Sequence, residues 1–313
     1  PLATYRNGPV SSNVRPHKMY AAVLARSWNE VKSIVLDRPG CVFRGQGRAE
    51  WQLETTLHRE ALRLNLGALG IEMLRGRESH LIKEFRRFAH HYLQVLPDDE
   101  DALAWLALIQ HYGGPTRLLD FSYSPYVAAF FAVDNATSDA ALWMIDRSSL
   151  ETASYNRLQH FPTGSISDLA DANATLLFGN KGPERDHPAV LHVEPSRLHE
   201  RIWIQKGLFL APTHPDKSFH ANLLSAFFRR SVKQLNKRPV RWNTTLEQRT
   251  KTEFPDRGFV SVLKVILPRS IHGEILEDLD SMNISSATLL PGLEGFARSL
   301  RHRIWPSSMW LHE

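Results

Sequence analysis

Apolar residues recur every three or four positions in several stretches of this chain, which is the spacing of a helix with one buried face. The first stretch predicts a helix from about Lys18 to Leu36, because Asp37-Arg38-Pro39-Gly40 then breaks the pattern. Ser124 followed by Pro125 is typical of a helix start and predicts a helix to about Val133. The same spacing predicts further helices over about Gly70–Val95, Glu100–His111, Ser218–Val232 and Ser270–Ser281, and after Pro291.

Short apolar runs bounded by turn-forming residues predict strands between these helices. The runs are Cys41–Gln46, Thr116–Phe121, Ala140–Ile145, Ala189–Val193, Ile202–Leu210 and Phe259–Leu267. Residues 163–182 are rich in Gly, Ser, Asp and Asn and predict a surface loop. Because helices and strands do not alternate regularly, the pattern favours an α+β fold: a single domain whose mixed, mostly antiparallel core sheet is flanked by helices.

The composition is that of an ordinary globular protein, since 42% of the 313 residues are hydrophobic and 23% are charged. The single cysteine, Cys41, excludes a disulfide scaffold and any metal site built from several cysteines. No apolar run approaches the roughly 18 residues of a membrane-spanning helix, and the start of the chain lacks a signal-peptide pattern. We therefore expect a cytoplasmic protein with no membrane partner.

Positive charge is concentrated late in the chain. Lys and Arg number 38 against 33 Asp and Glu, a net charge of +5. Between Phe227 and Lys251 the one acid, Glu247, stands among basic residues: Arg229, Arg230, Lys233, Lys237, Arg238, Arg241, Arg249 and Lys251. Such a stretch fits a phosphate backbone and makes nucleic acid a candidate partner; the alternative is a solvated helix face followed by a basic loop.

Several common catalytic motifs are absent from the sequence. It has no Walker-type phosphate loop, dinucleotide fingerprint, H-E-x-x-H or G-x-S-x-G elbow. His90 and His91 are adjacent, and neighbouring side chains on a helix point about a hundred degrees apart, so we expect no metal site. Cys41 as a nucleophile is less favoured than Cys41 as a small buried hydrophobic residue.

The strand predicted from Cys41 carries an arginine among apolar residues. Alternation places Cys41 and Phe43 on one face of this strand and Arg44 on the other. A guanidinium in such surroundings is costly unless an anion or a carboxylate meets it, so Arg44 predicts either a bound anion or an internal pair, with Asp120 as the partner. Gly45 leaves room beside it for a ligand or for a neighbouring backbone.

A second stretch concentrates polar side chains between two predicted helices. From Gln110 to Pro125 these side chains surround a Gly-Gly-Pro turn, which is more typical of a site than of a plain loop. The alternative is that Thr116, Arg117 and Asp120 only brace the turn.

A third stretch is the strand predicted over Ile202–Leu210. On a strand, Trp203, Gln205, Gly207 and Phe209 share one face. A glutamine between two aromatic residues is either an orienting group in a pocket or a cross-strand hydrogen-bonding residue, and both interpretations stay open.

These motifs, in this order, resemble the FRG domain family, named after Phe-Arg-Gly, over about residues 27–304. The matching pieces are Phe43-Arg44-Gly45-Gln46, Trp51 and Leu53, Gln110 to Gly113, Pro115 to Asp120, Ser124-Pro125 with Ala128 to Ala132, Arg201-Ile202 with Gln205, Gly207 and Phe209, and Leu289 to Gly295. The resemblance implies an FRG domain over residues 17–304, with a helical insert over about 60–112. A loose segment over 1–16 and a tail over 305–313 would flank it.

A second resemblance, to mono-ADP-ribosyltransferases of the Arg-Ser-Glu type, concerns the site. Those enzymes carry an Arg on an early strand, a Ser on a strand that leads into a helix, and a Glu on a later strand. Arg44, Ser122 and the segment from Glu200 to Phe209 match this order. The resemblance implies an ADP-ribosyltransferase-like fold in which Arg44 holds the diphosphate of NAD, Ser122 shapes the nicotinamide pocket and the Glu hydrogen-bonds the ribose.

By this resemblance NAD is the substrate, and no prosthetic group is expected. The residues predicted to bind it are Arg44, Gly45, Gln46, Thr116, Arg117, Asp120 and Ser122. Cleavage of the N-glycosidic bond develops positive charge on the ribose, so the site needs a cation for the diphosphate and a group that stabilises the charged ribose. The aromatic residues that could stack on the bases are Tyr112, Phe121, Tyr123 and Trp203.

The sequence departs from this pattern at the third element. Glu200 lies at the beginning of the matched segment, and the matched strand position is Gln205, whose amide carries no charge. The alternatives are that Glu200 is the catalytic acid, that Gln205 acts together with His111 as a base, or that transfer activity is absent.

Three functions remain open on the sequence. The first is an NAD-consuming, ADP-ribosyltransferase-like effector of the toxin or phage-defence type, with a macromolecular target such as nucleic acid and with an antitoxin or regulatory protein as partner. The second is a non-catalytic module that binds a nucleotide or a phosphorylated partner through Arg44 and Arg117. The third is a nucleotide hydrolase that uses His111 as general base.

Overall fold

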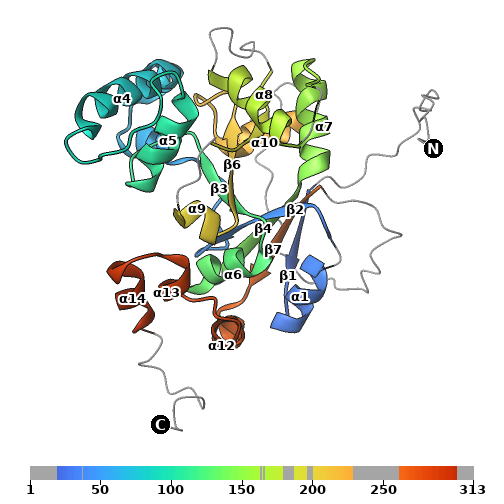
Figure 1. Ribbon diagram of the computed structural model, residues 1–313. Helices are drawn as coiled ribbons and strands as arrows, with labels where there is room; N and C mark the ends of the chain where they lie inside the picture. Colours follow the sequence, from blue (N-terminus) through green and yellow to red (C-terminus); the bar gives the residue numbers. More distant parts are fainter. Residues whose placement is uncertain are drawn as a thin grey trace, which may run out of the picture.

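The computed structural model describes residues 20–36, 38–162, 164, 166–178, 187–195, 200–227 and 261–301. In these residues one sheet runs through the centre of the molecule, with helices on both of its faces (Figure 1). The predicted segments 1–16 and 305–313, and the basic residues after Phe227, lie outside the described residues. No helix in the described part of the chain is long and apolar enough to cross a membrane.

Seven strands form this sheet in the described part of the chain. They are β1 (Tyr20–Leu24), β2 (Cys41–Gln46), β3 (Leu119–Ser122), β4 (Ala140–Asp146), β5 (Val190–Val193), β6 (Gly207–Pro212) and β7 (Val262–Leu267). Their order across the sheet is β1-β7-β4-β2-β3-β6-β5. Among these strands only the β1–β7 pair is parallel, so the predicted α+β class with a mixed, mostly antiparallel sheet is confirmed.

Helices cover both faces of the sheet in the described part of the chain. They are α1 (Trp28–Leu36), α2 (Thr56–Arg63), α3 (Gly67–Glu72), α4 (Leu74–Ala89), α5 (Ala102–His111), α6 (Pro125–Val133), α7 (Arg147–Leu158), α8 (Ile166–Phe178), α9 (Glu200–Ile204), α10 (Phe219–Phe227), the 3-10 helix η1 (Arg269–Ile271), α12 (His272–Ser281), α13 (Ser286–Leu289) and α14 (Leu293–Ser299). Helices α1, α6 and α12 cover one face of β2, β4 and β7, and α7 and α10 cover the other face. Helices α5 and α8 pack on β5 and β6.

Strand β2 shows how the alternating pattern becomes two hydrophobic cores. Cys41 and Phe43 lie in the core with α1 and α6, and Val42 lies in the core with α7 and α10. The predicted alternation is therefore confirmed. The start of α6 is also as predicted, since the Ser124 side chain accepts a hydrogen bond from the Val127 backbone at 3.3 Å, with Pro125 in the first turn.

The helix predicted from Lys18 to Leu36 was wrong in its first part. Tyr20–Leu24 is strand β1, which pairs in parallel with β7, and the helix begins only at Trp28. A short apolar run fits the spacing of a helix as well as that of a strand. The partner of β1, strand β7, is more than two hundred residues away in the sequence. The pairing across that distance decides the structure.

Two predictions in the middle of the chain were also wrong. The loop expected over 163–182 contains α8, which buries Ala170, Asn173 and Leu177 against the sheet and keeps its acidic residues on the outside. The strand expected over Ile202–Leu210 is helix α9 followed by β6. Lys206, with φ of +47°, turns the chain between them, so the expected shared face of Trp203 to Phe209 does not exist.

The sheet divides between β2 and β3. Strand β2 pairs with β4 along its whole length, and β3 pairs with β6 along its whole length. Between β2 and β3, however, the only paired residues are Phe43 and Ser122. We call the gap between these two strands the fork.

Gly45 allows helix α6 to lie against the end of β2. A Cβ atom at this position would lie 2.9 Å from Ala132 Cα and closer still to Ala128 O and Ala132 N. All three are backbone atoms of a helix, which cannot move aside individually. Of the two expected uses of the space beside Gly45, the neighbouring backbone is the one observed.

Substitution of Gly45 by alanine should therefore lower the free energy of unfolding by about 3 kcal/mol, because the added methyl group forces α6 away from the sheet. Denaturation in urea would measure it. The matched variant is Gly76→Ala on α4, where a Cβ atom meets nothing within 4 Å; there we expect no loss, or a gain of up to about 1 kcal/mol. Equal stability of the two variants would contradict this account of the glycine.

Candidate functional site

Arg44 occupies the fork. Its Nη1 donates a hydrogen bond to the Asp120 backbone oxygen at 2.6 Å and lies 3.6 Å from Asp120 Oδ2. The predicted pair with Asp120 is therefore confirmed. The Arg44 side chain is 20% exposed and that of Asp120 is 61% exposed, so the pair lies at the surface of the fork.

The surroundings of Arg44 are those of a site for an anion. Burial is the largest influence and lowers the pKa of Arg44, Asp120 opposes this change, and the positive charge of Arg59 adds to it. Arg44 Nε is buried and has no hydrogen-bond partner among the described residues. An anion that replaced the exposed carboxylate of Asp120 would meet a guanidinium with donors to spare.

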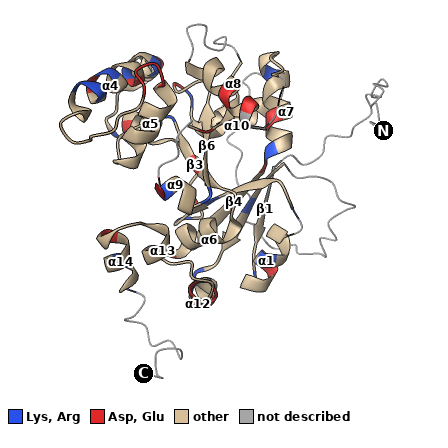
Figure 2. Cartoon of the chain, in the orientation of Figure 1, with Lys and Arg blue, Asp and Glu red and all other residues tan. Residues whose placement is uncertain are grey.

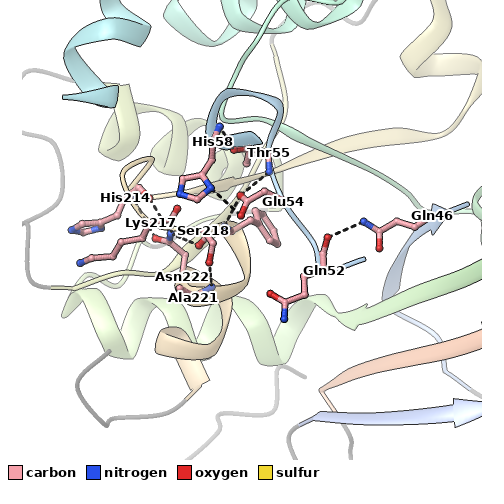
Figure 3. Close-up of polar contacts among 11 residues, drawn as sticks. Gln46, Gln52, Glu54, Thr55, His58, His214, Lys217, Ser218, Ala221 and Asn222 are labelled. Atoms are coloured by element: carbon pink, nitrogen blue, oxygen red, sulfur yellow. Dashed lines mark hydrogen bonds and ion pairs between the residues drawn. The ribbon is translucent and has the colours of Figure 1, made fainter. Parts of the chain in front are cut away.

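Gln46 supports the sheet beside Arg44. Its Oε1 accepts a hydrogen bond from Trp143 Nε1 at 2.6 Å. Its Nε2 donates to the Gln52 backbone oxygen at 3.1 Å (Figure 3). Both ends of the amide are therefore engaged by the protein. The predicted contact of Gln46 with a ligand remains a prediction, and the structure accounts for the residue without it.

The loop after β2 is anchored by an acidic residue that the sequence analysis missed. Glu54 Oε1 accepts hydrogen bonds from the backbone N–H groups of Thr55 and Phe219, at 3.0 and 2.9 Å, and its Oε2 lies 3.1 Å from His58 Nδ1 (Figure 3). The carboxylate thus joins the start of α2 to the start of α10. These contacts hold the starts of α2 and α10 together.

Thr116 and Arg117 are buried away from solvent. Thr116 Oγ1 donates to Gln110 Oε1, and the Thr116 backbone N–H donates to Thr56 Oγ1 at 2.9 Å. Arg117 Nε donates to Glu78 Oε2 at 2.5 Å, and both of these side chains are only 3% exposed. The structure supports the bracing role for these two residues, and their binding role remains a prediction without geometric support.

Ser122 and Gln205 are brought together, but through the backbone. Ser122 Oγ donates to the Gln205 carbonyl at 2.7 Å and accepts from the Ser124 N–H at 2.9 Å. Gln205 Nε2 donates to the Leu289 carbonyl at 2.9 Å. Ser122 also lies opposite Phe43, on the sheet face away from Arg44.

The other two predicted catalytic residues lie at helix ends. Glu200 is exposed in the first turn of α9. His111 is in the last turn of α5, where its ring meets the exposed ring of Tyr112 edge-on at 4.9 Å. Their catalytic roles remain predictions.

A cluster of titratable groups that the sequence analysis missed lies where β3 and β5 end. We call it the His192 cluster: Tyr123, Arg147, Glu151, His192 and Glu194. His192 is fully buried, with Nε2 at 2.9 Å from Glu194 Oε1 and Nδ1 at 3.7 Å from Glu151 Oε1. The Tyr123 hydroxyl donates to Glu194 Oε1 at 2.7 Å and accepts from Arg147 Nη1 at 3.3 Å. The signal in the sequence was a histidine and a glutamate two residues apart, which share one face at the end of a strand.

The charges in this cluster stabilise one another. Burial would lower the pKa of His192, but the carboxylates of Glu151 and Glu194 prevail and raise it. His192 in turn lowers the pKa of Glu194, with help from Tyr123 and Arg147, and burial raises the pKa of Tyr123 to about 12. Arg147 and Glu151 of α7, a helix whose basic and acidic residues are blue and red in Figure 2, complete the cluster.

Arg44 and the His192 cluster lie on the same face of the sheet. Phe121 pairs with Leu208, and the next residue on β6 pairs with Val193 of β5. Glu194 follows Val193 on β5 and therefore lies beside Leu208 of β6. Arg44, Phe121, Leu208 and Glu194 thus form one row across the strands β2, β3, β6 and β5.

Other candidate sites are not supported by the described residues. Cys41 is buried, and burial raises the pKa of its thiol to about 12, which argues against a nucleophile. No group of side chains in the described part of the chain could hold a metal ion. A hollow of about 780 Å³ between α7 and α10 contains none of the predicted site residues, and it borders Phe227 and Ser261, where the description is interrupted.

The Arg117–Glu78 pair should be a structural requirement. Glu78→Gln leaves a buried guanidinium without its counter-charge and should lower the free energy of unfolding by about 3 kcal/mol or more. Glu60→Gln breaks the exposed pair with Arg63 and should change stability by less than about 0.5 kcal/mol. Urea denaturation of the two variants would compare them, and similar small losses in both would show that the buried pair is dispensable.

Comparison with known proteins bears on the residues around the fork. The model of the FRG domain family matches residues 40–141, a segment that runs from β2 through β3 and α6 to the first two residues of β4. No curated protein and no solved structure matches the chain. The residues that build the fork, from Phe43-Arg44-Gly45 to Ser122, thus belong to an FRG domain.

Proposed function

We propose that the fork binds NAD as a substrate and that the chain is an ADP-ribosyltransferase-like enzyme. The observation that carries the proposal is the position of Arg44, which is largely buried between two strands. Among the described residues its one ion-pair partner is the solvent-exposed carboxylate of Asp120. A diphosphate is the kind of anion that a guanidinium binds through two donors at once. Displacement of the Asp120 carboxylate would open this position.

The surroundings of Arg44 also offer aromatic surface. Of the four aromatic residues expected to stack on a base, Phe121 is buried in the core, whereas Tyr112, Tyr123 and Trp203 are exposed. Tyr123 is on the same sheet face as Arg44 and follows β3 directly. It is therefore the best placed of the three to contact nicotinamide or its ribose.

The proposed reaction exchanges one bond for another. The bond between ribose C1′ and the nicotinamide nitrogen breaks, and its electron pair leaves with nicotinamide. The lone pair of an acceptor oxygen or nitrogen then forms the new bond to C1′, and the acceptor loses its proton to a base or to water. His111 remains the predicted base of the sequence analysis.

The acceptor is proposed to be a macromolecule, in keeping with an effector of the toxin or phage-defence type that a regulatory protein restrains. Nucleic acid is the acceptor that the basic residues between Phe227 and Lys251 favour, although those residues lie outside the described part of the chain after Phe227.

The second candidate function is a module that binds a nucleotide without turnover. It is favoured by one observation: Ser122 and Gln205, two of the residues expected at the reacting bond, are both engaged in hydrogen bonds to the backbone. In that case Arg44 would hold the ligand and no bond would break.

Arg44→Ala should abolish NAD chemistry if the proposal is correct. We expect the rate of nicotinamide release to fall about 100-fold or more, and the affinity for NAD to fall at least tenfold, because the cation for the diphosphate is lost. Arg44→Lys keeps the charge but not the paired donors, so it should retain part of the rate of nicotinamide release and part of the affinity for NAD. The assay is free nicotinamide, with NAD binding by calorimetry on the same samples.

Arg298→Ala, at an exposed pair on α14, is the matched variant and should behave as the parent protein. Urea denaturation shows whether each variant is folded. Binding of NAD that depends on Arg44, without any release of nicotinamide when nucleic acid is supplied as acceptor, would establish the binding module instead. Release that is unaffected by Arg44→Ala would exclude the fork as the site.

A further inference from the structure

We propose that Glu194 is the catalytic carboxylate of this site, and that His192 is the positioning residue that holds it. The proposal rests on the function proposed above. It replaces Glu200 and Gln205 in that role, and it assigns to the His192 cluster the task of facing the positive charge that develops on the ribose. Glu194 forms no covalent bond in this assignment, since it stabilises the charged ribose and accepts a hydrogen bond from a ribose hydroxyl.

The first support is the placement of Glu194 in the sheet. It follows β5 on the same face as Arg44 and lies in the same row of residues, with Phe121 and Leu208 between them. Three strand spacings, the first of them widened at the fork, separate β2 from β5, so the backbones are at least about 14 Å apart. Strand alternation puts Arg44 and Glu194 at positions of the same face, and the guanidinium of Arg44 turns into the fork toward the Asp120 backbone oxygen. We expect a dinucleotide whose diphosphate enters the fork to reach Glu194 with its ribose.

The second support is the way in which Glu194 is held. Its Oε1 receives the Tyr123 hydroxyl at 2.7 Å and lies 2.9 Å from His192 Nε2, while the side chain remains 35% exposed. A carboxylate fixed from behind by two groups and open in front is pre-organised for a ligand. Glu200, by contrast, is exposed in the first turn of a five-residue helix.

The third support is the buried histidine behind Glu194. His192 has no exposed surface, its backbone carbonyl accepts a hydrogen bond from Asn173 at 2.9 Å, and its ring lies between Glu194 and Glu151. Arg147 lies 3.6 Å from Glu151 on the far side. A buried imidazole between two carboxylates is expensive to maintain, and here the ring holds Glu194 in one position and lowers the pKa of its carboxyl.

The groups that face Glu194 set the pH range in which it is charged. From β5 His192 lowers the pKa of Glu194, and from β3 and α7 Tyr123 and Arg147 lower it further; burial alone opposes them. Glu151 faces His192 from α7 and raises its pKa. Glu194 thus remains a carboxylate to lower pH than an ordinary glutamate, and its support weakens as the pH rises through the raised pKa of His192.

Glu194→Gln tests the assignment directly. With the full chain and NAD, we expect nicotinamide release to fall about 100-fold or more, while the affinity for NAD changes only a few-fold, because Arg44 still holds the diphosphate. Glu277→Gln, the same change at an exposed position on α12, should leave release unchanged. Glu200→Gln is measured in parallel. A large loss of nicotinamide release in Glu200→Gln, with little loss in Glu194→Gln, would overturn the proposal.

His192→Gln distinguishes positioning from mere support of the fold. Removal of the cation should raise the pKa of Glu194, so the acid limb of the profile of nicotinamide release against pH should move to higher pH, and the alkaline decline due to His192 should disappear. A uniform loss at every pH, with no movement of either limb, would show that His192 only supports the structure. Thermal unfolding of each variant establishes that it is folded before its activity is compared.

Failure of the proposed function gives a different result. If the parent chain releases no nicotinamide at any pH with nucleic acid supplied as acceptor, both the proposed reaction and the role of Glu194 in it are excluded before any variant is compared. If the parent chain is active and Glu194→Gln is equally active, only the assignment of Glu194 fails.

Discussion

The contact between Gly45 and the backbone of α6 is the constraint on which the centre of this structure depends. Helix α6 begins three residues after β3 ends, and it must also press against the end of β2. Beside this contact, β2 and β3 pair only at Phe43 and Ser122. The gap that results is the place where Arg44 lies. Each residue of the Phe-Arg-Gly motif thus has its own role at the fork. Phe43 packs in the core, Arg44 places a cation in the gap, and Gly45 leaves room for the backbone of α6.

Two sets of buried charge illustrate how similar chemistry serves different ends. Arg117 and Glu78, a residue of α4, are buried together away from solvent. His192 is equally buried, but its partner Glu194 opens to solvent and shares a face with Arg44. Both sets are costly to bury. The first stabilises the attachment of the helices, whereas the second is directed toward the fork.

Several residues that the sequence analysis singled out serve the architecture. Ser122 and Gln205 link β3 to the α9–β6 turn and, through the Leu289 carbonyl, to α13. Gly295 lies so close to the carbonyls of Leu290 and Ser286 that no side chain would fit there. These contacts hold β3, the turn between α9 and β6, and the C-terminal helices together. Arg44 is the member of the motifs that faces outward with a donor to spare.

By itself, the sequence determined the class of fold, the strand that carries Arg44 and the start of α6, because these depend on local periodicity and caps. For Arg44 it left two partners open, an anion or Asp120, and the structure shows Asp120. The sequence did not determine the identity of Tyr20–Leu24 as a strand or the division of residues 200–210, since both depend on distant partners. Nor did it reveal the His192 cluster, whose five members come from three separate segments of the chain. Only the tertiary structure brings them together, because the pairing of β3, β6 and β5 places their ends side by side.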